Sequence, residues 1–285
     1  MNGINTETKL VGLLGYPLSH SRSAQMQNHA FKYSGLNFLY LPMEVEEDDL
    51  KAVVNGIRRM NFAGFNVTIP YKTKIMEYID ELDDLAGVIG SVNTAVVREK
   101  CIKGYNTDGE GFVRGLAETA GLSVKGKQVV VLGSGGAARA VTMTLAARGV
   151  DRLFICNRTR EKADGLSREI NEKIKNCAAV IPMETEAVKK ALKGTEILIN
   201  TTSIGMYPNR QQTPIDIGLV DSGTVVCDIV YNPVRTRLLS EASQKGCVTV
   251  DGIGMLVNQG AEAFKLWTGL KAPVKEMYRV LANEG

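Results

Sequence analysis

A glycine-rich turn between a buried strand and a helix constrains this chain more than any other feature. Gln128-Val-Val-Val-Leu132 is continuously apolar and largely β-branched, as expected of a parallel strand that is covered on both faces. Gly133-x-Gly135-x-x-Ala138 follows directly and leads into a helical pattern. The first glycine permits a tight turn, the second lets the backbone approach a pyrophosphate, and the small third residue lets helix and strand pack closely. This pattern predicts a dinucleotide-binding unit, with an ordinary strand-to-helix turn as the simpler alternative.

The end of the next predicted strand, 152–156, indicates which dinucleotide fits. An NAD-binding unit usually places Asp or Glu about 20 residues after the glycine turn. Here the strand is followed by Asn157-Arg158-Thr159-Arg160, with no carboxylate. Arg158 can pair with a 2′-phosphate through its planar guanidinium. The alternative is a solvated helix start, which leaves unexplained why positive charge gathers where the helix dipole disfavours it. We therefore predict NADP(H) as the cofactor.

Strands and helical patterns alternate along the whole chain, which indicates an α/β architecture with largely parallel sheet. At about 150 residues per domain, 285 residues predict two domains. We expect a three-layer α/β substrate domain over 1–108, a Rossmann-like NADP-binding domain over 109–253 and a cleft between them. Two helices over about 254–285 are expected to pack back on the first domain. Strands are expected at 9–15, 38–43, 63–68, 93–98, 101–105, 128–132, 152–156, 178–181, 196–200, 224–230 and 247–250.

Composition excludes several classes of protein. Thirty-four Lys and Arg against 31 Asp and Glu give a net charge of +3 without a basic block, which disfavours nucleic-acid binding. No apolar run approaches the ~18 residues of a membrane span, and the N-terminus lacks the pattern of a signal peptide. Five scattered cysteines and two histidines make a zinc site or a His-based triad improbable, so no metal is expected. A cytoplasmic enzyme with reduced thiols is the default prediction.

Polar side chains follow several of the predicted strands of the first domain. Ser19 and Ser21 flank a helix start, which they could either cap or use to bind a carboxylate. Thr68 and Lys72 lie around a proline turn, and Asn93 and Asp108 lie at a strand start and a strand-to-helix turn. Capping or solvation explains any one of these alone. Several of them at strand ends indicate a pocket.

The whole chain resembles the shikimate dehydrogenase family, NADP-dependent enzymes of aromatic amino-acid biosynthesis. The glycine turn of that family usually reads Gly-Ala-Gly-Gly, and Ser134 replaces the alanine here with a side chain small enough for the turn. The matching strings are Gly15-Tyr-Pro-Leu-Ser-His-Ser21, Asn66-Val-Thr-Ile-Pro-Tyr-Lys72, Gly90-Ser-Val-Asn-Thr94, Gly104-Tyr-Asn-Thr-Asp108-Gly, Gly133-Ser-Gly-Gly-Ala-Ala-Arg139, Asn157-Arg-Thr159, Asn200-Thr-Thr-Ser203, Asp228-Ile-Val-Tyr-Asn-Pro233 and Gly254-Met-Leu-Val-Asn-Gln259.

The resemblance implies reversible reduction of 3-dehydroshikimate to shikimate, with Lys72 and Asp108 as a catalytic pair. An ammonium suits this task because ketone reduction builds negative charge on the reacting oxygen. The substrate-binding residues that it implies are Ser19, Ser21 and Tyr231 for the carboxylate, and Thr68, Asn93, Asp108 and Gln259 for the ring hydroxyls. The implied cofactor-binding residues are Gly133, Gly135, Gly136, Ala137, Asn157, Arg158, Thr159, Thr202, Gly252 and Met255. Of these, the resemblance places Gly252 and Met255 near the nicotinamide, although Met255 fits a helix core equally well.

Other functions stay open at this stage. A quinate/shikimate dehydrogenase with broader substrate or NAD use is the nearest alternative, and the missing carboxylate after residue 156 argues against NAD. A non-catalytic dinucleotide sensor is the alternative of another class, and the presence of both Lys72 and Asp108 argues for catalysis. A folate-type methylene dehydrogenase is disfavoured by the paired serines. The resemblance implies a monomer or a homodimer, without nucleic acid or membrane as a partner.

Overall fold

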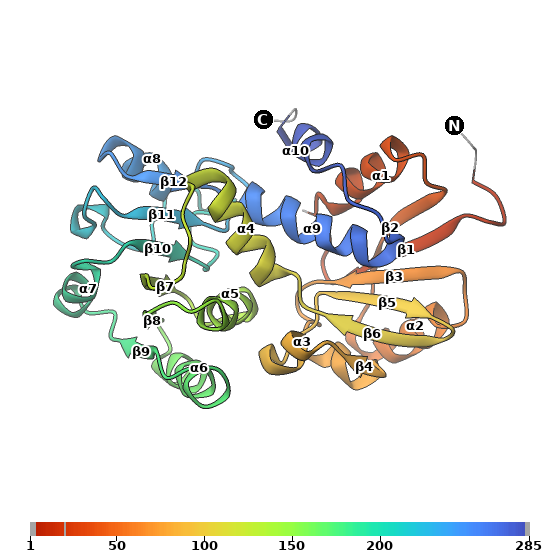
Figure 1. Cartoon of the computed structure of the whole chain (residues 1–285), viewed down its shortest axis with the longest axis horizontal. Coiled ribbons are helices and arrows are strands. Elements are labelled where there is room, and N and C mark those ends of the chain that lie inside the picture. The colour runs from red at the N-terminus through yellow and green to blue at the C-terminus, as the bar shows by residue number, and fades with distance from the viewer. Residues whose placement is uncertain (1–3, 20, 283–285) are drawn as a thin grey trace. The chain divides into compact units, whose positions relative to one another are not determined.

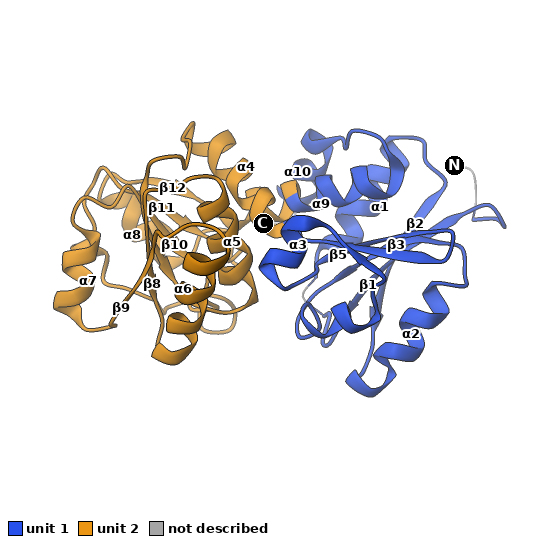
Figure 2. Cartoon of the chain, turned by 60° about the horizontal axis from the view of Figure 1, so that its bottom comes forward, with its two compact units in different colours: residues 1–107, 259–285 blue, residues 108–258 orange. Residues whose placement is uncertain are grey.

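Two six-stranded sheets organise the chain, each in its own unit. The computed structural model describes residues 4–19 and 21–282. Unit 1 contains the described residues up to Thr107 and from Gln259 onward, and unit 2 contains Asp108–Asn258 (Figure 2). The predicted α/β class with two sheets is confirmed.

The sheet of unit 1 is mixed rather than largely parallel. Its strand order is β2-β1-β3-β5-β6-β4, and pairing is antiparallel for β3 with β5 and for β5 with β6. Glu99 and Lys100, both with positive φ (50° and 65°), close the tight turn between β5 and β6, which forces these strands to run in opposite directions. The strands are β1 (Lys9–Gly15), β2 (Phe38–Glu44), β3 (Phe62–Val67), β4 (Glu81–Leu82), β5 (Thr94–Arg98) and β6 (Cys101–Tyr105).

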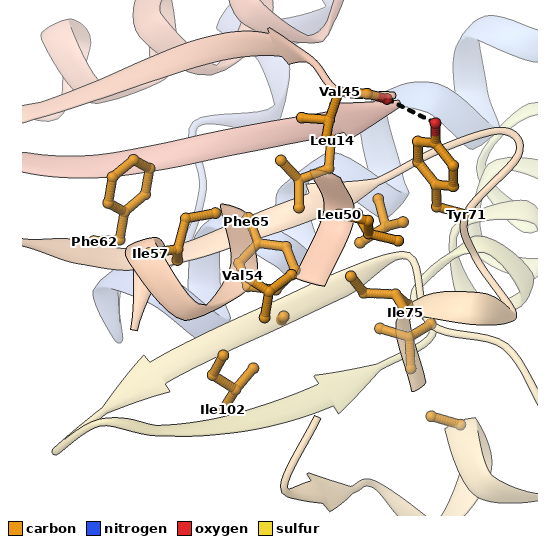
Figure 3. Close-up of a cluster of buried hydrophobic side chains, with 14 residues drawn as sticks. Leu14, Val45, Leu50, Val54, Ile57, Phe62, Phe65, Tyr71, Ile75 and Ile102 are labelled. Atoms are coloured by element: carbon orange, nitrogen blue, oxygen red, sulfur yellow. Dashed lines mark hydrogen bonds between the residues drawn. The ribbon is translucent and has the colours of Figure 1, made fainter. Parts of the chain in front are cut away.

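Helices cover both faces of this sheet, which gives the predicted three layers (Figure 1). On one face, α2 packs its apolar side onto the strands, with Leu50 and Val54 in the cluster that contains Phe65 (Figure 3). On the other face, the Phe31 ring of α1 stacks on Phe264 of α9, with centroids 5.3 Å apart. The helices are α1 (Ser23–Tyr33), α2 (Leu50–Ile57), α3 (Asp84–Ile89), α9 (Gly252–Thr268) and α10 (Val274–Ala282), with 3-10 turns at Glu47–Asp49 and Lys74–Tyr78.

The sheet of unit 2 is entirely parallel, in the order β12-β11-β10-β7-β8-β9. Because the strands on either side of β7 are β8 and β10, the winding reverses there, as in a Rossmann fold. The strands are β7 (Gln128–Leu132), β8 (Arg152–Cys156), β9 (Ala178–Ile181), β10 (Ile197–Asn200), β11 (Val225–Asp228) and β12 (Val248–Val250).

The helices of unit 2 also lie on both faces of its sheet (Figure 1). One face packs Val188 of α7 and Leu239 of α8 against Val130 and Leu198 of the strands. The helices are α4 (Asp108–Ala120), α5 (Gly136–Ala147), α6 (Arg160–Lys173), α7 (Thr185–Leu192) and α8 (Arg237–Gln244), with a 3-10 turn at Ile217–Leu219. No helix within residues 4–19 and 21–282 is both long and apolar enough to cross a bilayer.

Candidate active site

The turn that carries Thr68 and Lys72 is anchored at both of its ends by backbone hydrogen bonds. The Thr68 backbone N–H donates to the Leu14 carbonyl of β1 at 2.9 Å, and the Lys72 carbonyl accepts from the Val92 N–H at 2.8 Å. The aromatic ring between them is fixed as well, because the Tyr71 hydroxyl donates to the Val45 carbonyl at 2.6 Å (Figure 3). The backbone position of the half-buried Lys72 is therefore fixed by β1 at one end of the turn and by the segment that precedes β5 at the other.

Beside that turn lies a buried ladder of amide and hydroxyl groups in unit 1. Asn93, which is 3% exposed, donates from Nδ2 to the Thr107 hydroxyl at 2.9 Å and accepts from the Thr107 N–H at 2.8 Å. Asn66 donates to the Asn93 carbonyl at 3.0 Å and accepts from the Tyr40 hydroxyl at 2.8 Å. These bonds fix residue 107 within unit 1. They also use polar atoms of Asn93 for structure, a role that the sequence does not reveal.

Asp108 follows Thr107 directly and is the first residue of α4. Its side chain is buried, with 5% of the residue exposed. A carboxylate in the first turn of a helix is stabilised by the N-terminal end of the helix dipole. The link through residue 107 ties the start of α4 to the ladder of unit 1, although α4 itself belongs to unit 2.

The paired serines are not helix caps in the usual sense. The N-cap residue of α1 is Arg22, and α1 has no side-chain cap hydrogen bond. Ser21 accepts from the Ser23 N–H only at a long 3.4 Å, and Ser19 is exposed. Capping therefore explains little of why these hydroxyls occur here. His20, which the sequence suggests as a structural residue, lies outside the described residues.

Gln259 of unit 1 is half-buried in α9, next to a close contact with α1. The adjacent Gly260 carbonyl accepts from Nε2 of the buried Gln27 at 2.9 Å, so α1 and α9 are held together at this level. Tyr231 of unit 2 is also half-buried and follows β11. Both predicted substrate residues therefore lie on ordered, partly accessible segments.

The glycine turn of unit 2 has the geometry that the sequence predicts. Gly133 has φ +113°, a conformation that side chains disfavour, and a Cβ there would lie 2.6 Å from Oγ1 of Thr201. Beside Gly135 and Gly136 the space is open, because a Cβ at either position would meet no heavy atom within 4 Å. Ala137 follows in the first turn of α5, whose N-terminal N–H groups suit a phosphate. The turn thus leaves room for a diphosphate.

Asn157, Arg158 and Thr159 connect β8 to α6. Asn157 closes the turn by donating to the Thr159 carbonyl at 2.8 Å, and Arg158 is exposed. A second guanidinium nearby in the sequence, that of Arg139, is engaged by both oxygens of Glu169 at 2.9 and 2.6 Å. Those hydrogen bonds lower the pKa of Glu169 to about 2. The exposed Arg158 is thus the better placed of the two to meet an incoming phosphate.

Thr202, Gly252 and Met255 belong to two further segments of unit 2, the loop after β10 and the start of α9. The backbone N–H and hydroxyl of Thr202 both donate to Oδ1 of Asn200, at 3.0 and 2.7 Å. Gly252 packs against the backbone of Ile229 and the following residue so closely that a Cβ would overlap them. Met255 is half-buried in the first turn of α9. Within the described residues, no group of three His, Cys, Asp or Glu side chains could hold a metal ion.

Three family models match successive parts of the chain. They describe the shikimate dehydrogenase substrate binding domain (residues 13–95), shikimate / quinate 5-dehydrogenase (115–220) and the shikimate 5′-dehydrogenase C-terminal domain (252–282). A curated relative from Methanopyrus kandleri, named shikimate dehydrogenase (NADP(+)), is 45% identical over 96% of this chain and 95% of its own.

Solved structures match over the same length. A shikimate dehydrogenase in complex with NADP⁺ is 42% identical, with a TM-score of 0.92 over 98% of this chain and 96% of that one. A shikimate 5-dehydrogenase from Listeria monocytogenes, in complex with shikimate and NAD, is 38% identical, with a TM-score of 0.94 over 99% of both chains.

Proposed function

Since this chain belongs to the shikimate dehydrogenase family, we propose that it reversibly reduces 3-dehydroshikimate to shikimate with NADPH and that Lys72 and Asp108 are its catalytic pair. The enzyme is an NADP-dependent oxidoreductase. The observation that carries the residue assignment is that two consecutive residues hold both groups: the Val92 N–H donates to the Lys72 carbonyl, and the Asn93 side chain accepts from the Thr107 N–H directly before Asp108.

Each unit has a proposed task. Residues 1–108, with the helices from about 254 onward, would bind the substrate, and residues 109–253 would bind NADP(H). The open space beside Gly135 and Gly136 and the exposed Arg158 fit a diphosphate and a 2′-phosphate. Bound NADPH supplies the hydride. The cofactor set is completed by Gly133, Ala137, Asn157, Thr159, Thr202, Gly252 and Met255.

The protein handles the proton and the developing charge. In the direction of reduction, the Lys72 ammonium stabilises the oxyanion that forms on the substrate and donates a proton to it. In the reverse direction, the neutral amine accepts that proton. Asp108 accepts a hydrogen bond from a substrate hydroxyl.

The remaining polar residues orient the substrate. Ser19, Ser21 and Tyr231 would donate to its carboxylate, while Thr68, Asn93 and Gln259 would bind ring hydroxyls. Hydroxyl and amide groups suit this role because a buried polar ligand needs a partner for each of its groups.

Two further properties are part of the proposal. The five cysteines are all free, which fits a reducing compartment such as the cytoplasm. We expect a monomer or a homodimer, which light scattering will distinguish. Preference for NADP over NAD follows from Arg158 and from the absence of a carboxylate between Cys156 and Arg160.

The decisive experiment replaces Lys72 and a neighbouring lysine in parallel. Lys72→Ala should lower kcat by roughly a hundredfold or more, as expected when acid–base help is lost. Lys74→Ala is the matched control, because that ammonium is paired with Glu47 on the surface, and its kcat should be unchanged. Turnover of 3-dehydroshikimate is measured from NADPH absorbance, and the assay is repeated with NADH in place of NADPH. Oxidation of quinate is then measured in the reverse direction. Wild-type kcat in Lys72→Ala would remove this residue from the mechanism.

A further inference from the structure

A buried carboxylate in unit 2 has no part in the mechanism above. Asp228 is the last residue of β11, is 1% exposed and lies in register with Asn200, the last residue of β10. In a parallel sheet these strand ends border the ligand-binding edge. The residue therefore lies beneath the loops that would contact the cofactor.

Asp228 closes the loop that carries Tyr231. Its Oδ1 accepts from the Val230 N–H at 3.0 Å, at the start of that loop. Its Oδ2 accepts from the Thr236 hydroxyl at 2.8 Å, at the end of the loop, where Thr236 caps α8. One carboxylate thus holds both ends of residues 230–236.

The same carboxylate reaches a second loop through Asn200. Nδ2 of Asn200 donates to Oδ1 of Asp228 at 3.0 Å and to the Ile204 carbonyl at 3.2 Å, while its Oδ1 accepts two hydrogen bonds from Thr202. A third segment joins here, because Gly252 packs directly on the backbone that follows Asp228. Three of the segments that we propose to contact the cofactor or substrate therefore meet at one buried group.

The chemistry of this group is unusual for a purely structural role. Within residues 4–19 and 21–282, the partners of Asp228 are one backbone N–H, one amide and one hydroxyl, with no cation among them. Burying a carboxylate without a counter-charge is costly, and burial raises the pKa of Asp228 to about 6. A charged acceptor, however, forms stronger hydrogen bonds than a neutral one and so holds its donors more firmly.

We propose that Asp228 is a positioning residue, which fixes the Thr202, Tyr231 and Gly252 segments for the nicotinamide half of the cofactor. This inference rests on the proposed function. Arg158 would bind the 2′-phosphate of the adenosine half at the end of β8. Among the described residues, the donors to Asp228 are Val230, Asn200 and Thr236, and none of them lies at that end of β8. Loss of Asp228 should therefore weaken binding of the whole dinucleotide but not of its adenosine fragment.

Binding without turnover tests this assignment. Asp228→Ala should raise the Kd for NADPH about tenfold or more, the effect of losing hydrogen bonds to a charged group, and should leave the Kd for adenosine 2′,5′-bisphosphate within about twofold. Both constants are measured by titration calorimetry. Asp151→Ala is the matched control, because it removes an exposed carboxylate at the opposite end of β8 and should change neither constant. Equal effects of Asp228→Ala on both ligands, or on neither, would overturn the proposal.

Two further variants separate positioning from folding and from charge. Asp228→Asn can keep all three partners if the Thr236 hydroxyl turns to accept from the new amide, so it should restore most of the NADPH affinity. Thr236→Val keeps the side-chain shape and removes the hydrogen bond to Asp228 together with the cap bond from the Leu239 N–H. It should weaken NADPH binding less than Asp228→Ala does while the far-UV spectrum stays native. An Asp228→Asn variant as impaired as Asp228→Ala would contradict positioning. Wild-type protein that binds the fragment but not NADPH would instead contradict the proposed function.

Discussion

Gly109, the second residue of α4, should be intolerant of a single added methyl group. A Cβ at this position would lie 2.6 Å from the Ala140 carbonyl oxygen and 2.6 Å from Cβ of Thr144, and it would also overlap the Thr144 hydroxyl. Two of these neighbours are parts of α5 that cannot rotate away. Gly109→Ala can therefore be accommodated only if the start of α4 moves.

The size of the effect follows from these distances. Non-bonded carbon atoms prefer separations of about 3.5–4.0 Å, so α4 must shift by roughly 1 Å. Overpacking of this kind costs about 1–3 kcal/mol, offset by about 1 kcal/mol because alanine favours a helix more than glycine does. The same shift moves the adjacent Asp108, and a displacement of about 1 Å near reacting groups can cost about a hundredfold in rate.

Urea unfolding and shikimate oxidation measure the two consequences. Gly109→Ala should lower the free energy of unfolding by about 0–2 kcal/mol and kcat by about tenfold or more. Gly165→Ala in α6 is the matched control, because a Cβ there meets no heavy atom within 4 Å. This variant should have a free energy of unfolding about 0.5–1 kcal/mol higher than the wild type and an unchanged kcat. Gly109→Ala with wild-type stability and kcat would refute the reasoning.

Three further outcomes are expected. Arg158→Ala should raise the KM for NADPH about tenfold and leave that for NADH nearly unchanged, whereas Arg152→Ala, at the other end of β8, should affect neither. Ser19→Ala combined with Ser21→Ala should raise the KM for shikimate in steady-state assays, and a loss of stability with unchanged KM would support capping instead. Glu169→Gln should lower the free energy of unfolding by about 1 kcal/mol at pH 7, as measured by urea unfolding. The value is small because Glu169 is 33% exposed. Because the pKa of Glu169 falls from 4.5 to about 2 on folding, its contribution is present above pH 4.5, and the difference between variant and wild type should vanish as pH falls toward 2.

Several strands were predictable from continuous or alternating apolar residues. The expected ranges 9–15, 101–105, 128–132, 152–156 and 178–181 match β1, β6, β7, β8 and β9 to the residue. The sequence pattern predicts no strand from Lys74 to Ile89, a segment that contains a 3-10 turn, β4 and α3. In its charged string Asp80-Glu-Leu-Asp-Asp84, apolar residues do not recur at a regular spacing. The strand is therefore identified only by the pairing of β4 with β6.

In the candidate site, too, some features were predictable from the sequence and others were not. The open space beside Gly135 and Gly136 was predictable, because the backbone conformation of the turn depends on the residue types within it. The hydrogen bonds that join Thr107 to Asn93 and Asn200 to Asp228 were not, because their residues are 14 and 28 positions apart in the sequence and meet only when particular strands become neighbours. The mixed pairing of the first sheet is a similar case, since alternation of strands and helices does not specify strand direction.

Unit 1 is assembled from two separated stretches of chain, whereas unit 2 is continuous. During synthesis, unit 2 can therefore complete its sheet while the sheet made before it still lacks Phe264 and Trp267, two side chains that cover one of its faces. The part of that face that Trp267 covers stays exposed until residues 259–282 have left the ribosome, a period in which chaperone binding would be most useful. The first sheet to be translated is the last to be finished.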